Sequence, residues 1–330
     1  METYSLLPTY TSILNGERLP NYILCKHIPV SFNEKEDLED LWEKHDESLN
    51  QFSPLDYPQT PSLLDLKRTI ANRLIRNCHL CERRCRIDRT QKEGFCKVQK
   101  PRVASEFLHL GEERVLVPSY TVFFSGCTFH CVFCQNWDIS QYKVGLYIEP
   151  EILARMIEKR ESEGAKNVNW VGGDPTPNLP YILEVLSNCN AHLPQIWNSN
   201  MYCSIETMKL LNGIIDLYLT DFKYGNDDCA FRLSKVENYL KIVERNHLLA
   251  YEQTDVLVRH LVMPNHIDCC SIPVIKWLSR NLRGTPVNIM DQFRPEYEAY
   301  KYGDINRYPT KDEIQRILET AKDLGVHIID

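Results

Sequence analysis

Residues 120–137 read YTVFFSGCTFHCVFCQNW. The first five residues are aromatic or β-branched, which predicts a buried β-strand. The cysteines follow at the carboxyl end of this strand, the end at which parallel α/β proteins place their chemistry. Cys127, Cys131 and Cys134 offer three thiolates, one fewer than a [4Fe–4S] cluster binds. The stretch therefore predicts an iron–sulfur cluster with one iron left open for another ligand.

The composition is that of an ordinary globular protein. Of 330 residues, 43% are hydrophobic and 25% are charged, which allows one large α/β domain with an appendage or two domains. The formal charge of −7 argues against a nucleic-acid binder, which would present a basic surface to phosphates. No apolar run approaches the ~18 residues that span a bilayer, and the first residues show no signal peptide. We expect a cytosolic protein with neither a nucleic acid nor a membrane as partner.

A second group of cysteines precedes the first one. The chain has 13 cysteines, and without a secretory signal they favour metal ligation over a disulfide framework. Isolated buried cysteines are the alternative, but this group is interleaved with Arg, Glu and Lys, which are hard to place in a core. Four thiolates suit a tetrahedral zinc site and an auxiliary iron–sulfur cluster equally well. The four residues are Cys78, Cys81, Cys85 and Cys96.

Regular alternation of short apolar strands and amphipathic helices begins at Ser119 and predicts about six βα units. The fold class is therefore α/β: a partial (βα)6 barrel, similar to a TIM barrel, with an N-terminal helical, cysteine-rich extension. Right-handed crossovers would place the carboxyl ends of all these strands on one rim. The expected strands are 120–124, 167–171, 195–199, 214–221, 254–262 and 286–290, with a final short strand at 326–329, and the expected helices are 149–163, 178–191, 204–212, 228–248, 269–282 and 311–323.

Three domains or segments are expected. Residues 1–60 form a helical and irregular extension, with Leu38, Leu41 and Trp42 on one face of a surface helix. Residues 61–118 form a cysteine-rich metal-binding segment that packs on the barrel and includes an amphipathic helix at 61–77 and a strand at 103–109. Residues 119–330 form the barrel itself.

Polar residues and glycines follow the later strands, where they would face the cysteine loop. Gly172 and Gly173 would let the backbone approach a ligand closely, and Asp174 could accept hydrogen bonds from an ammonium, although a tight turn alone would use the same residues. Asp221 and Lys223 point to the same side of a strand, as a ligand contact or as a structural ion pair. The other polar residues at these strand ends are Asn198, Asn200, Arg259 and Gln292.

Several residues receive a structural interpretation. Glu112 and Glu113 beside His109 could serve acid–base chemistry, but adjacent acids on a turn are more often solvated. His260 is expected to be a packed or capping histidine. Adjacent cysteines rarely act together, so the pair Cys269–Cys270 is not assigned redox chemistry. The cysteines interpreted as structural are Cys25, Cys189, Cys203, Cys229, Cys269 and Cys270.

The C-x3-C-x2-C spacing, the aromatic Phe133 before the last cysteine, and the later Gly-Gly-Asp-Pro turn resemble the signature of radical S-adenosylmethionine (SAM) enzymes. Within that superfamily, the segments 123–127, 171–177, 259–264 and 288–292 resemble proteins related to the pyruvate formate-lyase activating enzyme. The resemblance covers residues 78–330. It departs from the activating enzymes of glycyl-radical enzymes in the four-cysteine group, which those enzymes generally lack.

The resemblance implies an oxygen-sensitive enzyme whose cofactors are a [4Fe–4S] cluster and SAM. The cluster is held by Cys127, Cys131 and Cys134, accepts one electron from a donor such as flavodoxin or ferredoxin, and splits SAM into methionine and a 5′-deoxyadenosyl radical. The Gly-Gly-Asp-Pro turn resembles the motif that holds the SAM amino group, with Asp174 in place of the usual Glu. The implied SAM-contacting residues are Phe133, Gly172, Gly173, Asp174, Asn198, Asn200, Asp221, Lys223, Arg259 (to the SAM carboxylate) and Gln292.

The substrate stays open at this stage. In the activating enzymes the radical abstracts hydrogen from a backbone glycine of a partner protein, which an open partial barrel could admit. A different peptide or a small metabolite is the first alternative. A non-enzymatic scaffold that holds iron–sulfur or zinc centres and carries electrons is the second.

Overall fold

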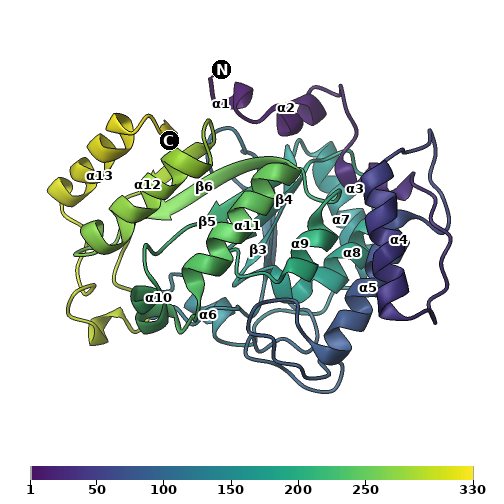
Figure 1. Cartoon of the computed structure of the whole chain (residues 1–330), viewed down its shortest axis with the longest axis horizontal. Helices are drawn as coiled ribbons and strands as arrows, with labels where there is room; N and C mark the ends of the chain where they lie inside the picture. The colour runs from purple at the N-terminus through teal and green to yellow at the C-terminus, as the bar shows by residue number, and fades with distance from the viewer. Residues whose placement is uncertain (1, 330) are drawn as a thin grey trace.

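The computed structural model describes residues 2–329 and contains one eight-stranded sheet in the order β1 to β8. β1 (Val103–His109) runs antiparallel to β2 (Ser119–Phe124), and the remaining strands are parallel. Helices cover the outer face of the curved sheet (Figure 1). The predicted α/β partial barrel is thus confirmed. The other strands are β3 (Asn167–Gly172), β4 (Gln195–Ser199), β5 (Leu217–Asp221), β6 (Asp255–Leu261), β7 (Pro286–Met290) and β8 (His327–Ile329).

The helices that follow the strands match the predicted positions, with two differences described below. Two of them begin at capping residues: Ser204 accepts a hydrogen bond from Thr207 N, and Thr310 forms a capping box with Glu313. Both caps satisfy backbone N–H groups left free at a helix start. The barrel helices are α6 (Trp137–Ser140), α7 (Pro150–Ser162), α8 (Leu179–Asn188), α9 (Ile205–Leu211), α10 (Asp227–Ser234), α11 (Tyr239–Gln253), α12 (Ile272–Asn281) and α13 (Lys311–Asp323), with short helical turns η2 (Thr176–Asn178), η3 (Ile267–Ser271) and η4 (Ala299–Lys301).

The prediction of one helix over 228–248 is wrong. The chain forms α10 and α11, and the break lies between Lys235 and Asn238, whose backbones are left-handed with φ of 58° and 51°. The break leaves the last carbonyls of α10 free to accept hydrogen bonds from another segment. Those carbonyls bind the cysteine loop that follows β2: His130 N donates to Ser234 O at 3.1 Å and Val132 N to Leu233 O at 2.9 Å. The interruption therefore positions the cysteine loop.

The prediction of one helix over 269–282 is also incomplete. The segment starts with a π-helical turn, η3, before α12 begins at Ile272. π-Helical turns are rare and occur often at functional sites. This turn contains Cys269 and Cys270 and is taken up again below.

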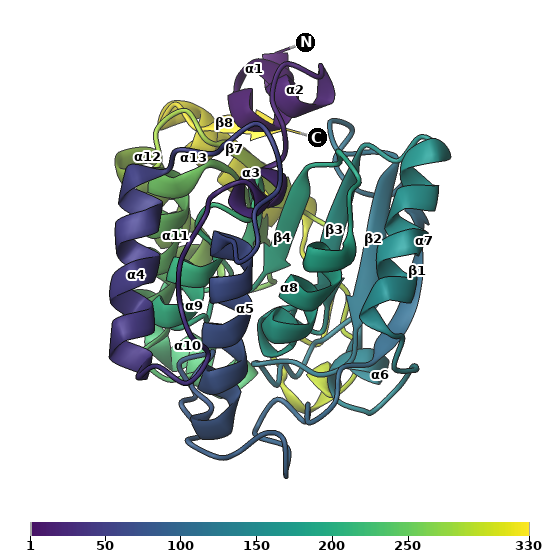
Figure 2. The same cartoon turned by 90° about the vertical axis from the view of Figure 1, so that its right-hand side faces the viewer.

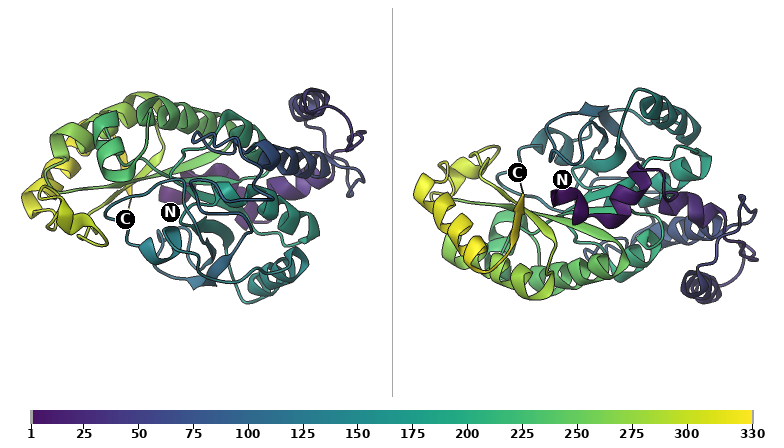
Figure 3. Two further views of the ribbon diagram at one scale, coloured as in Figure 1. Left: turned by 90° about the horizontal axis from the view of Figure 1, so that it is seen from below. Right: turned by 90° about the horizontal axis from the view of Figure 1, so that it is seen from above.

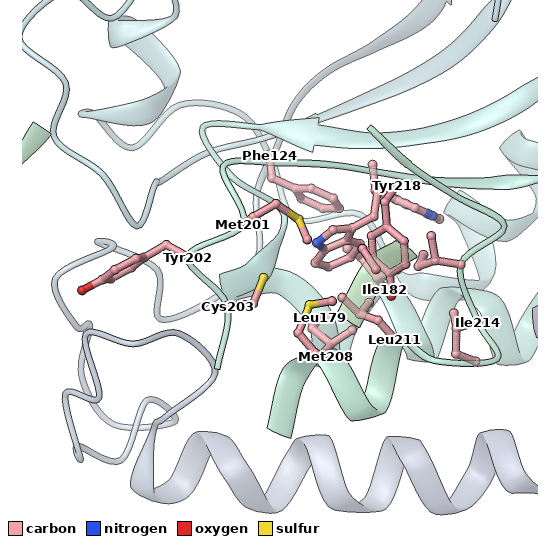
Figure 4. Packing of buried hydrophobic residues seen from close by; sticks show 14 of the residues in the cluster. Phe124, Leu179, Ile182, Met201, Tyr202, Cys203, Met208, Leu211, Ile214 and Tyr218 are labelled. Atoms are coloured by element: carbon pink, nitrogen blue, oxygen red, sulfur yellow. The ribbon is translucent and has the colours of Figure 1, made fainter. Parts of the chain in front are cut away.

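The outer face of the sheet packs on the helices through large apolar side chains. Strand residues alternate between the two faces of a sheet, so every second side chain of β2 points outward. Tyr120, Val122 and Phe124 of this strand are fully buried. Figure 4 shows this layer around Phe124 and Tyr218, which face side chains of α8 and α9 including Leu179, Ile182, Met208 and Leu211.

The N-terminal helices pack against two sides of the barrel. α1 (Glu2–Ser5) and α2 (Pro8–Leu14) lie across the amino-terminal ends of the strands, as Figure 3 shows. Leu7 and Tyr10 belong to a buried cluster that fills this end of the barrel, and Tyr10 N donates to Asp255 Oδ2 at 2.8 Å. The inward-facing members of the cluster are Val115, Leu116, Ile196, Leu217, Leu219 and Leu257.

Three further helices lie on the outside, next to α8 and α9 (Figure 2). They are α3 (Asn21–Lys26), α4 (Leu38–Gln51) and α5 (Leu63–Leu74), and α5 ends in the turn η1 (Ile75–Asn77). The fully buried Lys67 joins them to α9, because its Nζ contacts His45 Nε2 at 2.8 Å and donates to Asn212 O at 2.9 Å. Burial lowers the pKa of Lys67 to about 8. The division into three segments at residues 60 and 118 stays a prediction.

Within residues 2–329, no helix combines the length and the apolar character needed to cross a membrane.

The buried His260 makes the stability of this fold depend on pH. Its Nδ1 donates to Phe222 O at 2.7 Å, so Nε2 is left to accept from Ser271 Oγ at 2.8 Å, as expected for a packed histidine. Burial lowers the pKa of His260 to about 4. Below pH 6.5 the unfolded chain therefore binds a proton that the folded chain does not, and acid favours unfolding.

We expect the His260→Gln variant to be less stable than the wild type above pH ~7. The difference in the free energy of unfolding should shrink as the pH falls from about 6.5 to about 4, by at most about 1.4 kcal/mol per pH unit. Denaturant titrations at a series of pH values measure it. A difference between wild type and His260→Gln that stays constant over this pH range would contradict the assignment.

Candidate active site

The candidate active site is a cavity of about 770 Å³ at the carboxyl-terminal ends of the parallel strands. Cys127, Cys131 and Cys134 line it on one side, together with Phe133. The structure brings all but one of the predicted SAM-contacting residues to the same cavity. These residues are Gly172, Gly173, Asn198, Asn200, Asp221, Lys223, Arg259 and Gln292.

Each cysteine of the loop after β2 has a hydrogen-bonding neighbour at its sulfur. Phe129 N donates to Cys127 Sγ at 3.3 Å, and Ser234 Oγ lies 2.9 Å from Cys131 Sγ. Cys134 Sγ lies 3.2 Å from the hydroxyl of Ser140. Such donors stabilise thiolate ligands and tune the reduction potential of an iron–sulfur cluster.

Burial raises the pKa of all three thiols, to about 12 for Cys131. Free thiols in this place would stay protonated at neutral pH, and cluster binding would release their protons. The pair Asp221–Lys223 lies beside them and forms the predicted ion pair. Burial alone would lower the pKa of Lys223, but the Asp221 carboxylate and the nearby Cys131 and Cys127 sulfurs raise it. A permanent positive charge therefore faces the loop.

Packing within the chain is enough to require glycine in the turn after β3, without any contact to a ligand. A Cβ on Gly172 would overlap the backbone of Phe124, and a Cβ on Gly173 would overlap the carbonyl oxygen of Gly126. Because no side chain intervenes, Gly173 N donates to Phe124 O at 2.9 Å and Gly173 O lies 3.2 Å from Cys127 Sγ. The turn and the cysteine loop are therefore packed backbone against backbone.

Asp174 is the predicted contact that does not line the cavity. It is buried, and its carboxylate accepts hydrogen bonds from Thr176 N at 2.9 Å, Ser199 Oγ at 2.9 Å and Asn200 N at 3.2 Å. Its contact with the SAM ammonium stays a prediction. In the structure, Asp174 ties the turn after β3 to the end of β4 and so fixes Asn200, whose Nδ2 donates to Thr128 Oγ1 at 2.9 Å.

Arg259 has a different partner from the predicted SAM carboxylate. Its guanidinium binds Glu113 in a bidentate pair, with Nε–Oε1 at 2.8 Å and Nη2–Oε2 at 2.7 Å, and also binds Glu112. The interpretation of both glutamates as solvated is wrong, because their side chains are only 6% and 1% exposed. Burial alone would raise the pKa of Glu113, but Arg259 and Asn288 lower it.

This ion-pair network forms the polar floor of the cavity. Glu112 Oε1 accepts from Asn169 Nδ2 at 3.2 Å and lies 3.1 Å from His109 Nδ1, while Glu113 Oε1 accepts from Asn288 Nδ2 at 2.8 Å. Sequence reasoning considered His109, Glu112 and Glu113 and set them aside. It assigned no role to Asn169 and included Asn288 only as part of the segment 288–292. The signal that could have found the network was the buried charge of Arg259, which required a carboxylate inside the chain.

The four-cysteine group lies directly behind the cysteine loop. Cys78, Cys81, Cys85 and Cys96 surround one small cavity together with Arg83, Arg84 and Arg89. A Cβ on Gly126 would overlap the carbonyl oxygen of Cys96, and Arg83 Nε donates to Thr128 O at 3.0 Å. The two cysteine groups are therefore in contact through their backbones.

The backbone around these four cysteines is held in unusual conformations. Arg84, Arg86 and Lys97 have left-handed backbones, with φ of 41°, 55° and 60°. Such conformations cost free energy for residues with a side chain, and they concentrate at functional sites. Burial raises the pKa of the Cys81 and Cys96 thiols. The four cysteines of this loop line the same small cavity.

The structure also brings together three cysteines that the sequence had suggested were structural. Cys229, Cys269 and Cys270 meet at His266. Among the described residues, they form the one group of three or more Cys, His or carboxylate ligands whose atoms lie within 4.8 Å of one another.

Comparison with known proteins agrees with this geometry. The family model of the radical SAM superfamily matches residues 121–278. An uncharacterised protein of Methanocaldococcus jannaschii is 48% identical to this chain over 98% of the chain and 99% of its own length. The chain belongs to the radical SAM superfamily.

Radical SAM enzymes are also found among similar solved structures. Streptococcus suis SuiB bound to S-adenosylmethionine has a TM-score of 0.47 and 13% identity, over 61% of this chain and 47% of SuiB. This radical SAM chain thus spans about half the length of SuiB. Methylornithine synthase has a TM-score of 0.46 and 16% identity, over 97% of this chain and 78% of that one. The radical SAM assignment brings with it a [4Fe–4S] cluster and SAM as cofactors.

The three thiols on one loop and the open cavity in front of them suit that cofactor pair.

We expect Gly173→Ala to disturb the cluster loop, because the added methyl group overlaps the Gly126 carbonyl. Overpacking of this kind costs about 1–3 kcal/mol, and the variant should bind less iron after anaerobic reconstitution. A methyl group added at Gly303 would have no other atom within 4 Å, so Gly303→Ala is the matched control. Equal iron content in the two variants would contradict the proposed packing constraint.

Proposed function

We propose that this radical SAM enzyme abstracts a hydrogen atom from a substrate bound on the cavity floor beside Glu112, Glu113 and Arg259. The observation that carries the proposal is the single cavity that joins the cluster cysteines, the glycine turn and this floor. The reduced cluster with bound SAM would supply a 5′-deoxyadenosyl radical. The reaction requires one electron, for which a flavodoxin or ferredoxin is a suitable donor.

The chain's own residues would hold SAM between the cysteine loop and the strand ends. The carbonyls of Gly172 and Gly173 can accept from the SAM ammonium, while Asn198 and Lys223 can donate to its carboxylate or ribose. Arg259 binds two carboxylates, whereas the Lys223 ammonium has three N–H donors and gives one to Asp221, so we assign the contact with the SAM carboxylate to Lys223 rather than to Arg259. Cys127, Cys131 and Cys134 would bind three irons and leave the fourth to SAM.

We also propose a class of substrate, based on the boundaries of the cavity. His109 of β1 and Ile329 of β8 line the same cavity, although they belong to opposite ends of the strand order. The cavity is therefore bounded on both sides and closed at the bottom by the cluster around Leu7 and Tyr10. This supports a small polar metabolite, or the end of a peptide, as substrate. A glycine in a folded partner protein, as in the activating-enzyme reaction, is the second candidate.

The radical chemistry has a direct test. Anaerobically reconstituted protein should form 5′-deoxyadenosine from SAM in the presence of dithionite, and Cys131→Ala should abolish the product. Cys189 is buried and lies outside the three cysteine groups, so Cys189→Ala is a matched control that should keep the activity. Product formation can be followed by liquid chromatography and mass spectrometry. An intact cluster without 5′-deoxyadenosine would favour the alternative of a non-enzymatic scaffold.

We further propose that Cys78, Cys81, Cys85 and Cys96 bind a second iron–sulfur cluster rather than zinc. The four-cysteine loop touches the backbone of the first cluster loop, because a Cβ on Gly126 would overlap the carbonyl oxygen of Cys96; this proximity suits electron transfer between two clusters, for which a zinc ion has no use. Cys85 is half-buried whereas Cys78, Cys81 and Cys96 are buried. A cluster here would lie between solvent and the first cluster, where it could pass on an electron.

Metal analysis distinguishes an iron–sulfur cluster from a zinc ion at the four-cysteine group. A variant with Cys127, Cys131 and Cys134 all changed to Ala should still bind about four irons per chain, the content of one [4Fe–4S] cluster. Adding Cys81→Ala and Cys96→Ala should remove this iron. Zinc without iron in the triple variant would overturn the second cluster and leave the first one untouched.

A further inference from the structure

A cluster of three thiols and one imidazole lies away from the active-site cavity. Cys229 is in the first turn of α10, Cys269 and Cys270 are in the π-helical turn η3, and His266 precedes that turn. None of the four residues lines the cavity that holds the SAM site. The loops after β5 and β6 bring them together.

The distances match the ligand sphere of one tetrahedral metal ion. Cys269 Sγ lies 4.0 Å from Cys229 Sγ and 3.9 Å from Cys270 Sγ. His266 Nδ1 lies 3.6, 3.3 and 3.7 Å from the sulfurs of Cys229, Cys269 and Cys270. Tetrahedral zinc, with Zn–S of about 2.3 Å and Zn–N of about 2.0 Å, places its ligand atoms about 3.5–3.8 Å apart. The group is too compact for an iron–sulfur cubane.

The histidine is oriented for metal binding by a carboxylate. His266 Nε2 lies 3.0 Å from Asp304 Oδ2. An ionised carboxylate can only accept, so Nε2 carries the proton and Nδ1 presents its lone pair to the three sulfurs. Arg232, which lies 3.2 Å from the same nitrogen, donates to Asp304 and fixes that carboxylate. Carboxylate–histidine pairs of this kind are a regular outer shell of zinc sites.

The two segments are held together before any metal arrives. Asn226 caps α10 by accepting from Cys229 N at 2.8 Å, and its Nδ2 donates to Cys269 O at 2.8 Å and lies 3.8 Å from Cys270 Sγ. Gly225 allows this approach, because a Cβ there would lie 2.7 Å from the carbonyl oxygens of both Cys269 and Cys270. The ligands are therefore prearranged by backbone contacts.

Burial is uneven across the group. Cys270 is fully buried and His266 is 3% exposed, whereas Cys229 is half-buried and Cys269 is exposed. One side is thus accessible for a metal ion to enter. A disulfide between Cys229 and Cys269 would involve two of the thiols. It would not explain why the thiol of Cys270 and the oriented imidazole of His266 lie beside them.

We propose that Cys229, His266, Cys269 and Cys270 bind one structural zinc ion, separate from both iron–sulfur sites. Three thiolates and one imidazole fill all four positions of tetrahedral zinc, so no position is left for a substrate. The ion would link η3 to α10. The other end of α10 supports the cluster loop through the contact of Ser234 Oγ with Cys131 Sγ at 2.9 Å.

The zinc content of anaerobically purified, full-length protein tests the site. Changing Cys229→Ser together with Cys269→Ser should remove one zinc per chain and leave the iron content unchanged. The matched control is Cys25→Ser with Cys189→Ser, two buried cysteines outside every group, which should keep the zinc. Because zinc is counted separately from iron, the result does not depend on whether the protein cleaves SAM. Equal zinc in the two variants would overturn the proposal.

A measurement on the wild-type chain covers the case in which the double variant fails to fold. Cys269 is exposed, so a free thiol there should react readily with iodoacetamide. With zinc bound, alkylation of Cys229 and Cys269 should be slow and should speed up at least tenfold after a zinc chelator is added, as read from peptide masses. Rapid alkylation without chelator, or a Cys229–Cys269 disulfide in the purified protein, would overturn the proposal.

Discussion

The close contact between two backbones, the turn after β3 and the loop after β2, is the constraint on which this site depends. Gly172 and Gly173 remove the side chains that would hold the segments apart, and Gly126 does the same toward Cys96 on the other side. Three layers of main chain are thereby stacked: the glycine turn, the cluster loop and the four-cysteine loop. The position of Cys127 follows from this stacking, since its sulfur lies 3.2 Å from Gly173 O.

A second constraint is electrostatic and sets the floor of the cavity. Arg259 projects from β6 into the cavity, where its side chain is only 14% exposed, and an unpaired guanidinium there would be costly. The chain provides Glu112 and Glu113 from the segment between β1 and β2, so a loop far away in sequence is bound inside the barrel. Two carboxylates against one guanidinium leave an excess of negative charge, which would favour a substrate that carries a donor or a positive charge.

The sequence predicted the positions of the strands well because these follow from local patterns. Alternating apolar strands and amphipathic helices show a parallel sheet, and the residues after each strand must lie on one rim. The break at Lys235–Asn238 was not predicted, because a left-handed lysine and asparagine carry no strong sequence signal and the apolar period continues across them. The partners of Arg259 and the meeting of Cys229 with Cys269 depend on contacts between distant segments, which periodicity does not show.

The sealed lower end of the barrel has a kinetic consequence. Leu7 and Tyr10 fill the amino-terminal end of the barrel, so the carboxyl-terminal rim is the direct route into the cavity. The network of Glu112, Glu113 and Arg259 lies deeper than the strand ends that would hold SAM. A molecule bound at that depth is covered once SAM occupies the rim. Along this route the substrate would bind first and SAM second, and the spent adenosine would leave before the product.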